Sequence, residues 1–298
     1  MRRGTLMAGS AYVIWGLLPI YWRALATVTP GEILVHRILW SLVVCLLLLA
    51  LRKNWGWLRD GMRKPAGFRV SVITAVLLAI NWLVYIWAAN SGHLVEASLG
   101  YFITPLISVL LGVVILRERL RIGQLAAILV AALGVIYLII NAGGLLWISF
   151  SLALSFGIYG LLRKTSKLGS LEGLSIEMII LTLPAAVFLL LLAGRGESAF
   201  VTQSWTVTLL LALTGVLTAG PLLLFAAGAR LVPLTALGIL QYVTPTLQFL
   251  IGVLIYDEAF TRTRLVGFSI IWGALAIYTA EIFLTRRRQR QLLAAASS

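Results

Sequence analysis

Charged residues are scarce in this chain. Asp, Glu, Lys and Arg make up 11% of its 298 residues, whereas 61% are hydrophobic and the mean hydropathy is +1.02. A water-soluble chain of this length needs far more polar surface to cover its core. The apolar residues come in blocks of about 18 to 22, the length that spans a ~30 Å hydrocarbon layer as a helix. Because backbone polar groups must be paired within lipid, the sequence predicts an all-α membrane protein.

Cysteine and histidine are also scarce. The single cysteine, Cys45, excludes a disulfide framework and a thiolate metal site. His36 and His93 do not form a His-Glu-x-x-His zinc motif, and the chain has no Gly-rich loop followed by Lys-Ser/Thr for ATP. We therefore expect no cofactor, no metal and no catalytic residues, and an energy source other than ATP.

Ten apolar blocks predict ten transmembrane helices. They cover residues 5–24, 33–51, 69–89, 95–116, 122–140, 145–162, 174–193, 206–227, 234–255 and 264–284. Of the 24 Lys and Arg residues, 19 fall on the side that carries both termini and 4 on the other side. The positive-inside rule then predicts that both termini are cytoplasmic. This asymmetry explains the pI near 10.7 without a nucleic-acid partner, although the basic cluster 286–290 can also contact anionic membrane lipids.

An internal repeat appears when the chain is shifted by 140 residues. Residues 103–118 then align with 243–258, and both segments carry Thr-Pro, a Gly and a Glu at the same spacing. The chain thus divides into two five-helix repeats, 1–141 and 142–285, and a basic cytoplasmic tail, 286–298. Because each repeat has an odd number of helices, the two repeats are inverted relative to each other. Inverted repeats let one solute site face each side of a membrane in turn.

Several motifs identify a family. They are Ala11-Tyr12 with Trp15-Gly16, Glu32-Ile33-Leu34 with His36-Arg37, Asn81-Trp82-Leu83, the run Glu96–Ile103, Ser155-Phe156 with Tyr159-Gly160-Leu161, and Gln241-Tyr242 with Pro245-Thr246-Leu247. On these motifs nearly the whole chain resembles the drug/metabolite transporter superfamily with two EamA-type repeats, and most closely its RarD (chloramphenicol-sensitivity) branch. The resemblance implies a multi-pass permease of the bacterial plasma membrane that works as an exporter.

Three ionisable residues stand out within the predicted spans, where such groups are costly and therefore usually functional or paired. The shift of 140 places Arg37 opposite Glu177, one in each repeat. We expect them to form an ion pair or a proton-responsive cluster with His36, which would allow proton coupling. The alternative is that Arg37 and Glu177, each near the start of its helix, reach interfacial water.

A polar stripe recurs on the equivalent helices 95–116 and 234–255. It consists of Ser98, Tyr101, Pro105, Ser108 and Gly112 on the first helix, and of Gly238, Gln241, Pro245, Gln248 and Gly252 on the second. Polar side chains on one face point away from lipid, toward other helices or a cavity. The prolines remove a backbone donor and predict kinks that can serve gating. The glycines fit close helix packing.

Aromatic residues with polar groups beside them line other predicted faces. Residues Tyr12, Trp15, Asn81, Tyr85 and Tyr159 are such candidates. With the polar stripe they suit a planar or amphipathic small molecule, such as a metabolite, an amino acid or an amphenicol-like drug. The sequence therefore predicts a secondary-active transporter. The alternative is an integral-membrane enzyme that acts on a lipid-linked or amphipathic substrate.

Two residues at predicted helix ends have simpler interpretations. Glu118 lies between Arg117 and Arg119, which predicts a local ion pair. Trp22 falls near a predicted interface, where the aromatic belt of a membrane protein gathers.

Overall fold

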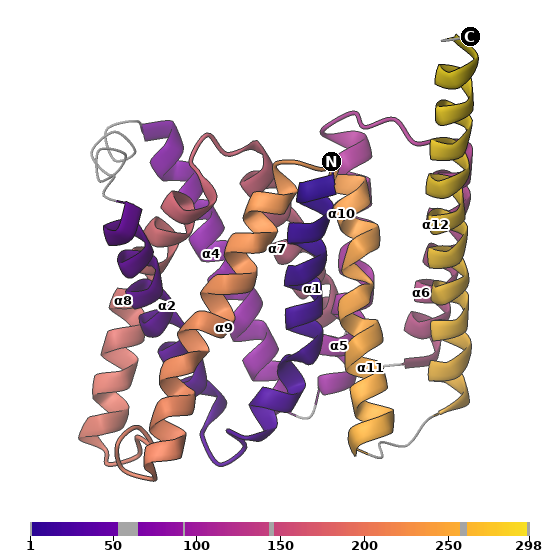
Figure 1. Cartoon of the computed structure of the whole chain (residues 1–298). Helices are drawn as coiled ribbons and strands as arrows, with labels where there is room; N and C mark the ends of the chain where they lie inside the picture. Colours follow the sequence, from indigo (N-terminus) through magenta and orange to yellow (C-terminus); the bar gives the residue numbers. More distant parts are fainter. Residues whose placement is uncertain (1, 53–64, 92, 143–145, 257–260, 297–298) are drawn as a thin grey trace.

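The computed structural model in Figure 1 describes residues 2–52, 65–91, 93–142, 146–256 and 261–296. Every regular element in these ranges is a helix, and ten of the helical segments there are long and apolar enough to cross a bilayer. The helices are α1 (Arg2–Arg23), α2 (Pro30–Arg52), α4 (Pro65–Asn90), α5 (Leu94–Val114), α6 (Ile122–Ala142), α7 (Leu146–Thr165), α8 (Ser170–Gly194), α9 (Trp205–Ala229), α10 (Leu234–Gln241), α11 (Val243–Tyr256) and α12 (Arg262–Ala296). The all-α class and the ten spans are confirmed, with α10 and α11 together forming the ninth span.

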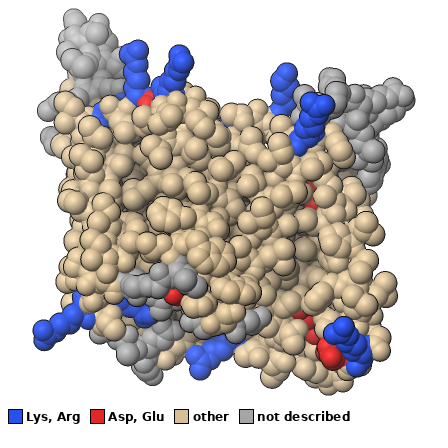
Figure 2. Space-filling view, turned by 180° about the vertical axis from the view of Figure 1, so that it is seen from behind, with Lys and Arg blue, Asp and Glu red and all other residues tan. Residues whose placement is uncertain are grey.

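The outer surface of the bundle suits lipid. Large apolar side chains such as Leu47, Leu183 and Leu190 are 60%, 73% and 72% exposed. Figure 2 shows the Lys and Arg side chains gathered at the two ends of the molecule, with a nearly uncharged band between them. Such a band matches the hydrocarbon layer, and the charged ends match the headgroup regions.

The two ends of the bundle can be told apart by the termini. The start of α1 and the end of α12 lie at the same end, at the top of Figure 1, which we call the terminal rim. Residues 115–121 and 230–233 connect helices at this rim. The opposite end, which we call the distal rim, carries the connections 24–29 and 195–204.

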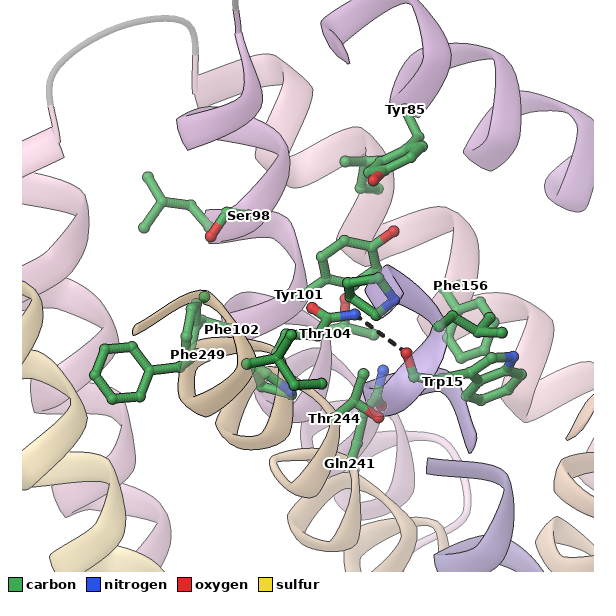
Figure 3. A pocket seen from close by; sticks show the side chains of 18 of the residues that line it. Trp15, Tyr85, Ser98, Tyr101, Phe102, Thr104, Phe156, Gln241, Thr244 and Phe249 are labelled. Atoms are coloured by element: carbon green, nitrogen blue, oxygen red, sulfur yellow. Dashed lines mark hydrogen bonds between the residues drawn. The ribbon is translucent and has the colours of Figure 1, made fainter. Parts of the chain in front are cut away.

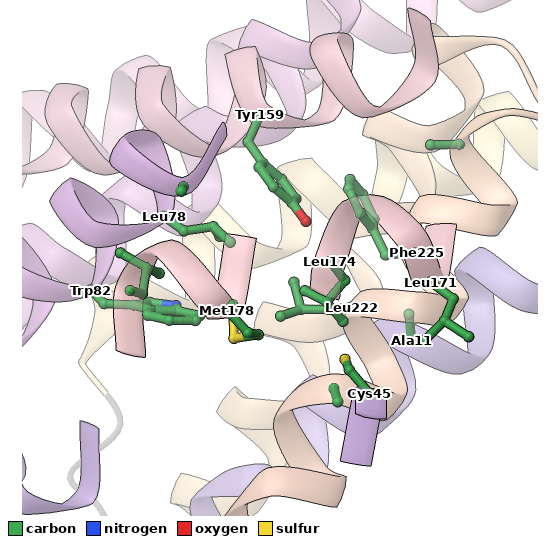
Figure 4. Packing of buried hydrophobic residues seen from close by; sticks show 14 of the residues in the cluster. Ala11, Cys45, Leu78, Trp82, Tyr159, Leu171, Leu174, Met178, Leu222 and Phe225 are labelled. Carbon is green, nitrogen blue, oxygen red and sulfur yellow. The ribbon is translucent and has the colours of Figure 1, made fainter. Parts of the chain in front are cut away.

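Helices from the two sequence halves pack directly against each other. Helix α9 contacts α1 and α2, α5 contacts α7 and α10, and α6 contacts α12. Small residues permit this close approach. A Cβ atom on Gly215 would collide with the backbone of Trp40, and one on Gly228 would lie 2.8 Å from the amide nitrogen of Ala8. The largest apolar cluster, part of which is seen in Figure 4, joins α1, α2, α8 and α9.

The two predicted proline kinks differ. Helix α5 continues through Pro105, whereas the ninth span is interrupted at Tyr242, between α10 and α11. Pro245 has no N–H to donate to the Gln241 carbonyl four residues earlier, so the helical hydrogen-bond ladder is broken at this place. The interruption lies in the middle of the bundle.

Candidate functional site

A cavity of about 870 Å³ lies between the two sequence halves. Helices α1, α2, α4, α5 and α6 contribute to its lining from the first half, and α7, α9, α10, α11 and α12 from the second. Its lining includes Leu152 and Phe156 of α7, in the middle of the bundle. From there its lining reaches Tyr256, Thr261 and Arg264 at the distal rim. A volume of this size accommodates a drug-sized organic molecule.

Aromatic side chains form much of the cavity wall. The Trp15 and Phe156 rings meet edge to face, with 5.6 Å between centroids, and both point toward the cavity in Figure 3. Phe102 and Phe249 lie on the opposite side of the same view. Both pack against Phe268, with 5.0 Å between the ring centroids of Phe102 and Phe268 and 4.2 Å between those of Phe249 and Phe268. Rings held in this way offer flat apolar surfaces for a planar solute.

Polar groups converge on the same space. The rings of Tyr85 and Tyr101 lie 6.0 Å apart, and the Gln241 side chain reaches up from the interrupted ninth span (Figure 3). Within the described ranges, none of these three side chains has a hydrogen-bond partner. Asn81 differs, because its amide nitrogen donates to the Leu152 carbonyl at 3.0 Å and to the Ser155 hydroxyl at 2.9 Å. The side chains of Tyr85, Tyr101 and Gln241 can therefore form hydrogen bonds with a solute in the cavity.

Arg37 brings a positive charge to the cavity. Its Nε donates to the Thr218 hydroxyl at 3.1 Å, which links α2 to α9. Its guanidinium lies over two indole rings, 5.2 Å from the Trp22 centroid and 5.0 Å from the Trp82 centroid. Trp22 thus lines the cavity together with Arg37.

The predicted site residues divide into two groups. Those that line the cavity are Trp15, Arg37, Asn81, Tyr85, Tyr101, Gln241 and Gln248, together with Pro245. Those found elsewhere in the bundle are Tyr12, His36, Ser108, Tyr159 and Glu177, together with Pro105. Spacing along the helices could identify a polar face, but it could not decide whether that face meets the cavity or another helix.

The predicted pairing of Arg37 with Glu177 is wrong in this structure. Glu177 instead lies 3.6 Å from the Arg163 guanidinium and accepts hydrogen bonds from Thr74 at 2.6 Å and from Tyr159 at 3.3 Å. This cluster is fully buried between α4, α7 and α8. The interfacial-water alternative is therefore wrong for Glu177 as well.

The physical reason is that α2 and α8 run antiparallel. Glu32, near the start of α2, binds the segment 198–200 that follows α8, whereas Cys45, further along α2, lies beside Ser175 near the start of α8. Arg37 and Glu177 occupy the same position from the start of their helices. Equivalent positions on antiparallel neighbours lie toward opposite ends of the bundle.

His36 and Ser108 have packing roles. The His36 Nδ1 accepts from the Trp40 indole at 3.2 Å, and the His36 ring lies 4.6 Å from the Phe200 ring, so it helps to hold the segment 198–200 on α2. Ser108 is buried against α10, where its Cβ would lie 3.2 Å from a Cβ on Gly238. Tyr12, fully buried in the main apolar cluster, is likewise a core residue.

Two charged residues bind helix ends at the terminal rim, and the sequence did not suggest either role. Glu118 accepts hydrogen bonds from the backbone amides of Leu234 at 2.7 Å and Thr235 at 2.9 Å, at the start of α10. Lys164 donates to the carbonyls of Ala229, at 3.2 Å, and Val232, at the end of α9. Both charges complement the helix dipoles. Glu118 therefore does not simply pair with its neighbouring arginines.

Comparisons with known proteins agree with this architecture. Residues 2–140 match the model of the EamA-like transporter family. Protein RarD of Streptomyces exfoliatus is 46% identical over 297 residues, which cover 99% of this chain and 94% of that protein. An uncharacterized transporter of Vibrio cholerae serotype O1 is 41% identical over 280 residues, 94% of this chain and 93% of the relative.

A crystal structure of a protein with 20% sequence identity superposes with a TM-score of 0.70 and covers 93% of this chain and 98% of that one, so the two share a fold. The near-complete coverage by relatives, together with ten membrane-spanning helices in the described residues, establishes the family. The chain belongs to the EamA-type permeases of the drug/metabolite transporter superfamily, in their RarD branch, and is a multi-pass protein of the bacterial inner membrane.

Proposed function

We propose that the protein is a secondary-active exporter of a small organic solute and that it works by alternating access between two inverted five-helix repeats, residues 1–141 and 142–285. The observation that carries the proposal is the cavity lined by both halves. It extends from the middle of the bundle to the distal rim, while Glu118 and Lys164 hold the terminal rim closed. A site that reaches one side while the other is closed is what alternating access requires.

The distribution of basic residues supports an orientation. With 19 of the 24 Lys and Arg residues on its side, the terminal rim faces the cytoplasm, and the cavity then opens outward. The tail 286–298 is cytoplasmic in this orientation. The side chains of its basic cluster, 286–290, lie outside the described residues.

Uptake into proteoliposomes tests the proposed function. The solute panel contains amino acids, aromatic metabolites and amphenicol-type drugs, each assayed with and without a pH gradient. We expect saturable uptake of at least one solute above protein-free liposomes. Faster uptake with a pH gradient would support proton coupling, for which buried Glu177 is the first candidate. An absence of uptake, combined with measurable turnover of a lipid-linked substrate, would instead establish the membrane-enzyme alternative.

A further inference from the structure

Arg37 is an incompletely satisfied cation in apolar surroundings, near the distal start of α2. It is half-buried, and its Nε is used by Thr218. In the described part of the chain, the two terminal guanidinium nitrogens have no hydrogen-bond partner and no carboxylate forms an ion pair with them. The two indole faces of Trp22 and Trp82 compensate only part of the lost hydration, because cation–π contacts are weaker than a charge-assisted hydrogen bond. The free edge of the guanidinium is therefore a site for an anion.

The surroundings of Arg37 fix its plane and position. Thr218 holds the Nε edge, and the indoles of Trp22 and Trp82 lie beside the guanidinium. A planar guanidinium with two free nitrogens matches the two oxygens of a carboxylate, which it can bind through parallel hydrogen bonds. An ammonium group or a neutral solute would leave the charge uncompensated.

The other residues that line the cavity also favour a negatively charged solute. Among its described lining residues only Arg37 and Arg264 are charged, and none is an Asp or Glu. The phenols of Tyr85 and Tyr101 lie within electrostatic range of the Arg37 guanidinium. As hydroxyl groups they can donate to an anion held there. The described lining therefore has no carboxylate that could form an ion pair with an amine.

We propose that the cavity selects a planar aromatic carboxylate, a monoanion whose carboxylate binds Arg37 and whose ring lies among the aromatic side chains of the wall. The proposal rests on the proposed transport function and narrows its substrate class. A neutral amphenicol lacks the charge that Arg37 requires. A zwitterionic amino acid brings an ammonium group for which the described lining has no carboxylate.

Equilibrium binding to the full-length protein in nanodiscs tests the proposal. The probes are naphthalene-2-acetate, its neutral amide and 2-(2-naphthyl)ethylamine, which share one fluorescent ring and differ in charge. We expect the acetate to bind at least ~10-fold more tightly than the amide, as a charge-assisted hydrogen-bond pair predicts, and the amine to bind most weakly. Equal affinity for acetate and amide, or tighter binding of the amine, would overturn the proposal.

Substitutions of Arg37 test whether this residue causes the preference for the acetate. Arg37→Gln should weaken acetate binding by ~10- to 100-fold and leave the amide unchanged, whereas Arg37→Lys should keep part of the preference for the acetate. Arg195→Gln is the matched control, because Arg195 is an exposed arginine at the same rim that does not line the cavity. Retention of the full acetate preference in a folded Arg37→Gln variant would contradict the proposal.

Parallel uptake of the same three probes separates the two proposals. If the amide is bound and transported as well as the acetate, transport stands and the charge preference is wrong. If the acetate binds in an Arg37-dependent manner but neither it nor the wider solute panel enters proteoliposomes, the anion site stands and the transport proposal fails.

Discussion

Buried charges divide into two kinds at the level of single residues. Arg37 faces the cavity with two free nitrogens, whereas Arg163 is 1% exposed and is held by Glu177 and by the carbonyls of Gly169 and Ser170 at 3.1 Å. Both arginines lie in apolar surroundings. Of the Arg163 side-chain nitrogens, only Nε lacks a partner among the described residues. We therefore expect Arg163 to stabilise the fold, whereas we propose that Arg37 binds a solute.

The Arg163–Glu177 pair predicts a non-additive effect on stability. Glu177→Leu alone leaves the Arg163 charge buried without its partner and should destabilise the protein by ~3–5 kcal/mol. The double variant Arg163→Met/Glu177→Leu removes both charges and should be more stable than Glu177→Leu alone. Thermal unfolding of the detergent-solubilised protein measures both effects.

Glu197→Gln, an exposed carboxylate at the distal rim, serves as the control and should leave the melting temperature unchanged. A double variant less stable than Glu177→Leu would contradict the prediction, because it would show that Arg163 still stabilises the protein without Glu177, through the carbonyls of Gly169 and Ser170.

At the scale of helices, the junction between α9 and α10 depends on residues from elsewhere in the chain. Pro233, the N-cap residue of α10, has no side-chain acceptor, so the first amides of the helix need another partner. The Glu118 carboxylate, in the segment that follows α5, is this partner. Arg117 turns the chain with a φ of 54°, and the Glu118 amide then donates to the Gly112 carbonyl at 3.0 Å. A side chain at Gly112 would meet the Glu118 carboxylate at 2.9 Å.

Loss of this cap should loosen the terminal rim. Glu118→Ala leaves the start of α10 without its cap, which typically costs ~1 kcal/mol and thus shifts an open–closed equilibrium about 5-fold. A cysteine introduced at buried Ser108, which packs against Gly238 of α10, reports the opening in a Cys45→Ala background. We expect maleimide labelling of this cysteine to become about 5-fold faster in the Glu118→Ala variant.

Arg119→Ala distinguishes the cap from a local ion pair. Arg119 is exposed and adjacent to Glu118, so its removal should leave the labelling rate unchanged. If Arg119→Ala accelerates labelling as much as Glu118→Ala does, the ion pair and not the helix cap closes this rim.

For the complete bundle, the cavity lies between halves that are distant in sequence, and its lining extends to the distal rim. Residues of α1, α2 and α4 face residues of α9 and α11 across it. The proposed orientation makes this end external, while the terminal rim, with Thr165 exposed at the end of α7, is cytoplasmic.

Labelling of intact cells tests this orientation. In the Cys45→Ala background, Ser98→Cys in the cavity should react with a membrane-impermeant maleimide, because Ser98 is exposed to the cavity. Thr165→Cys should react only after the cells are permeabilised. The reverse pattern would place the termini outside, and reaction of neither cysteine before permeabilisation would mean that the cavity is closed to the exterior.

The class of the protein, the ten spans and the family could all be predicted from the amino-acid sequence. The length and hydropathy of each span are local properties, and lipid permits only helices for such segments, so no knowledge of packing was needed. The repeated Thr-Pro spacing also identified Tyr101 and Gln241 as equivalent residues, and both line the cavity.

Which buried polar residues meet each other could not be predicted from the sequence, because it depends on how the helices pack. The rotation and direction of each helix depend on contacts with helices far away in the sequence. Thus Arg37 and Glu177, equivalent in the repeat, are separated because α2 and α8 run antiparallel, and Ser108 packs on Gly238 while Tyr101 of the same helix reaches the cavity. The role of Glu118 depended on the same cross-half packing, because the amides that it binds begin 116 residues later in the chain.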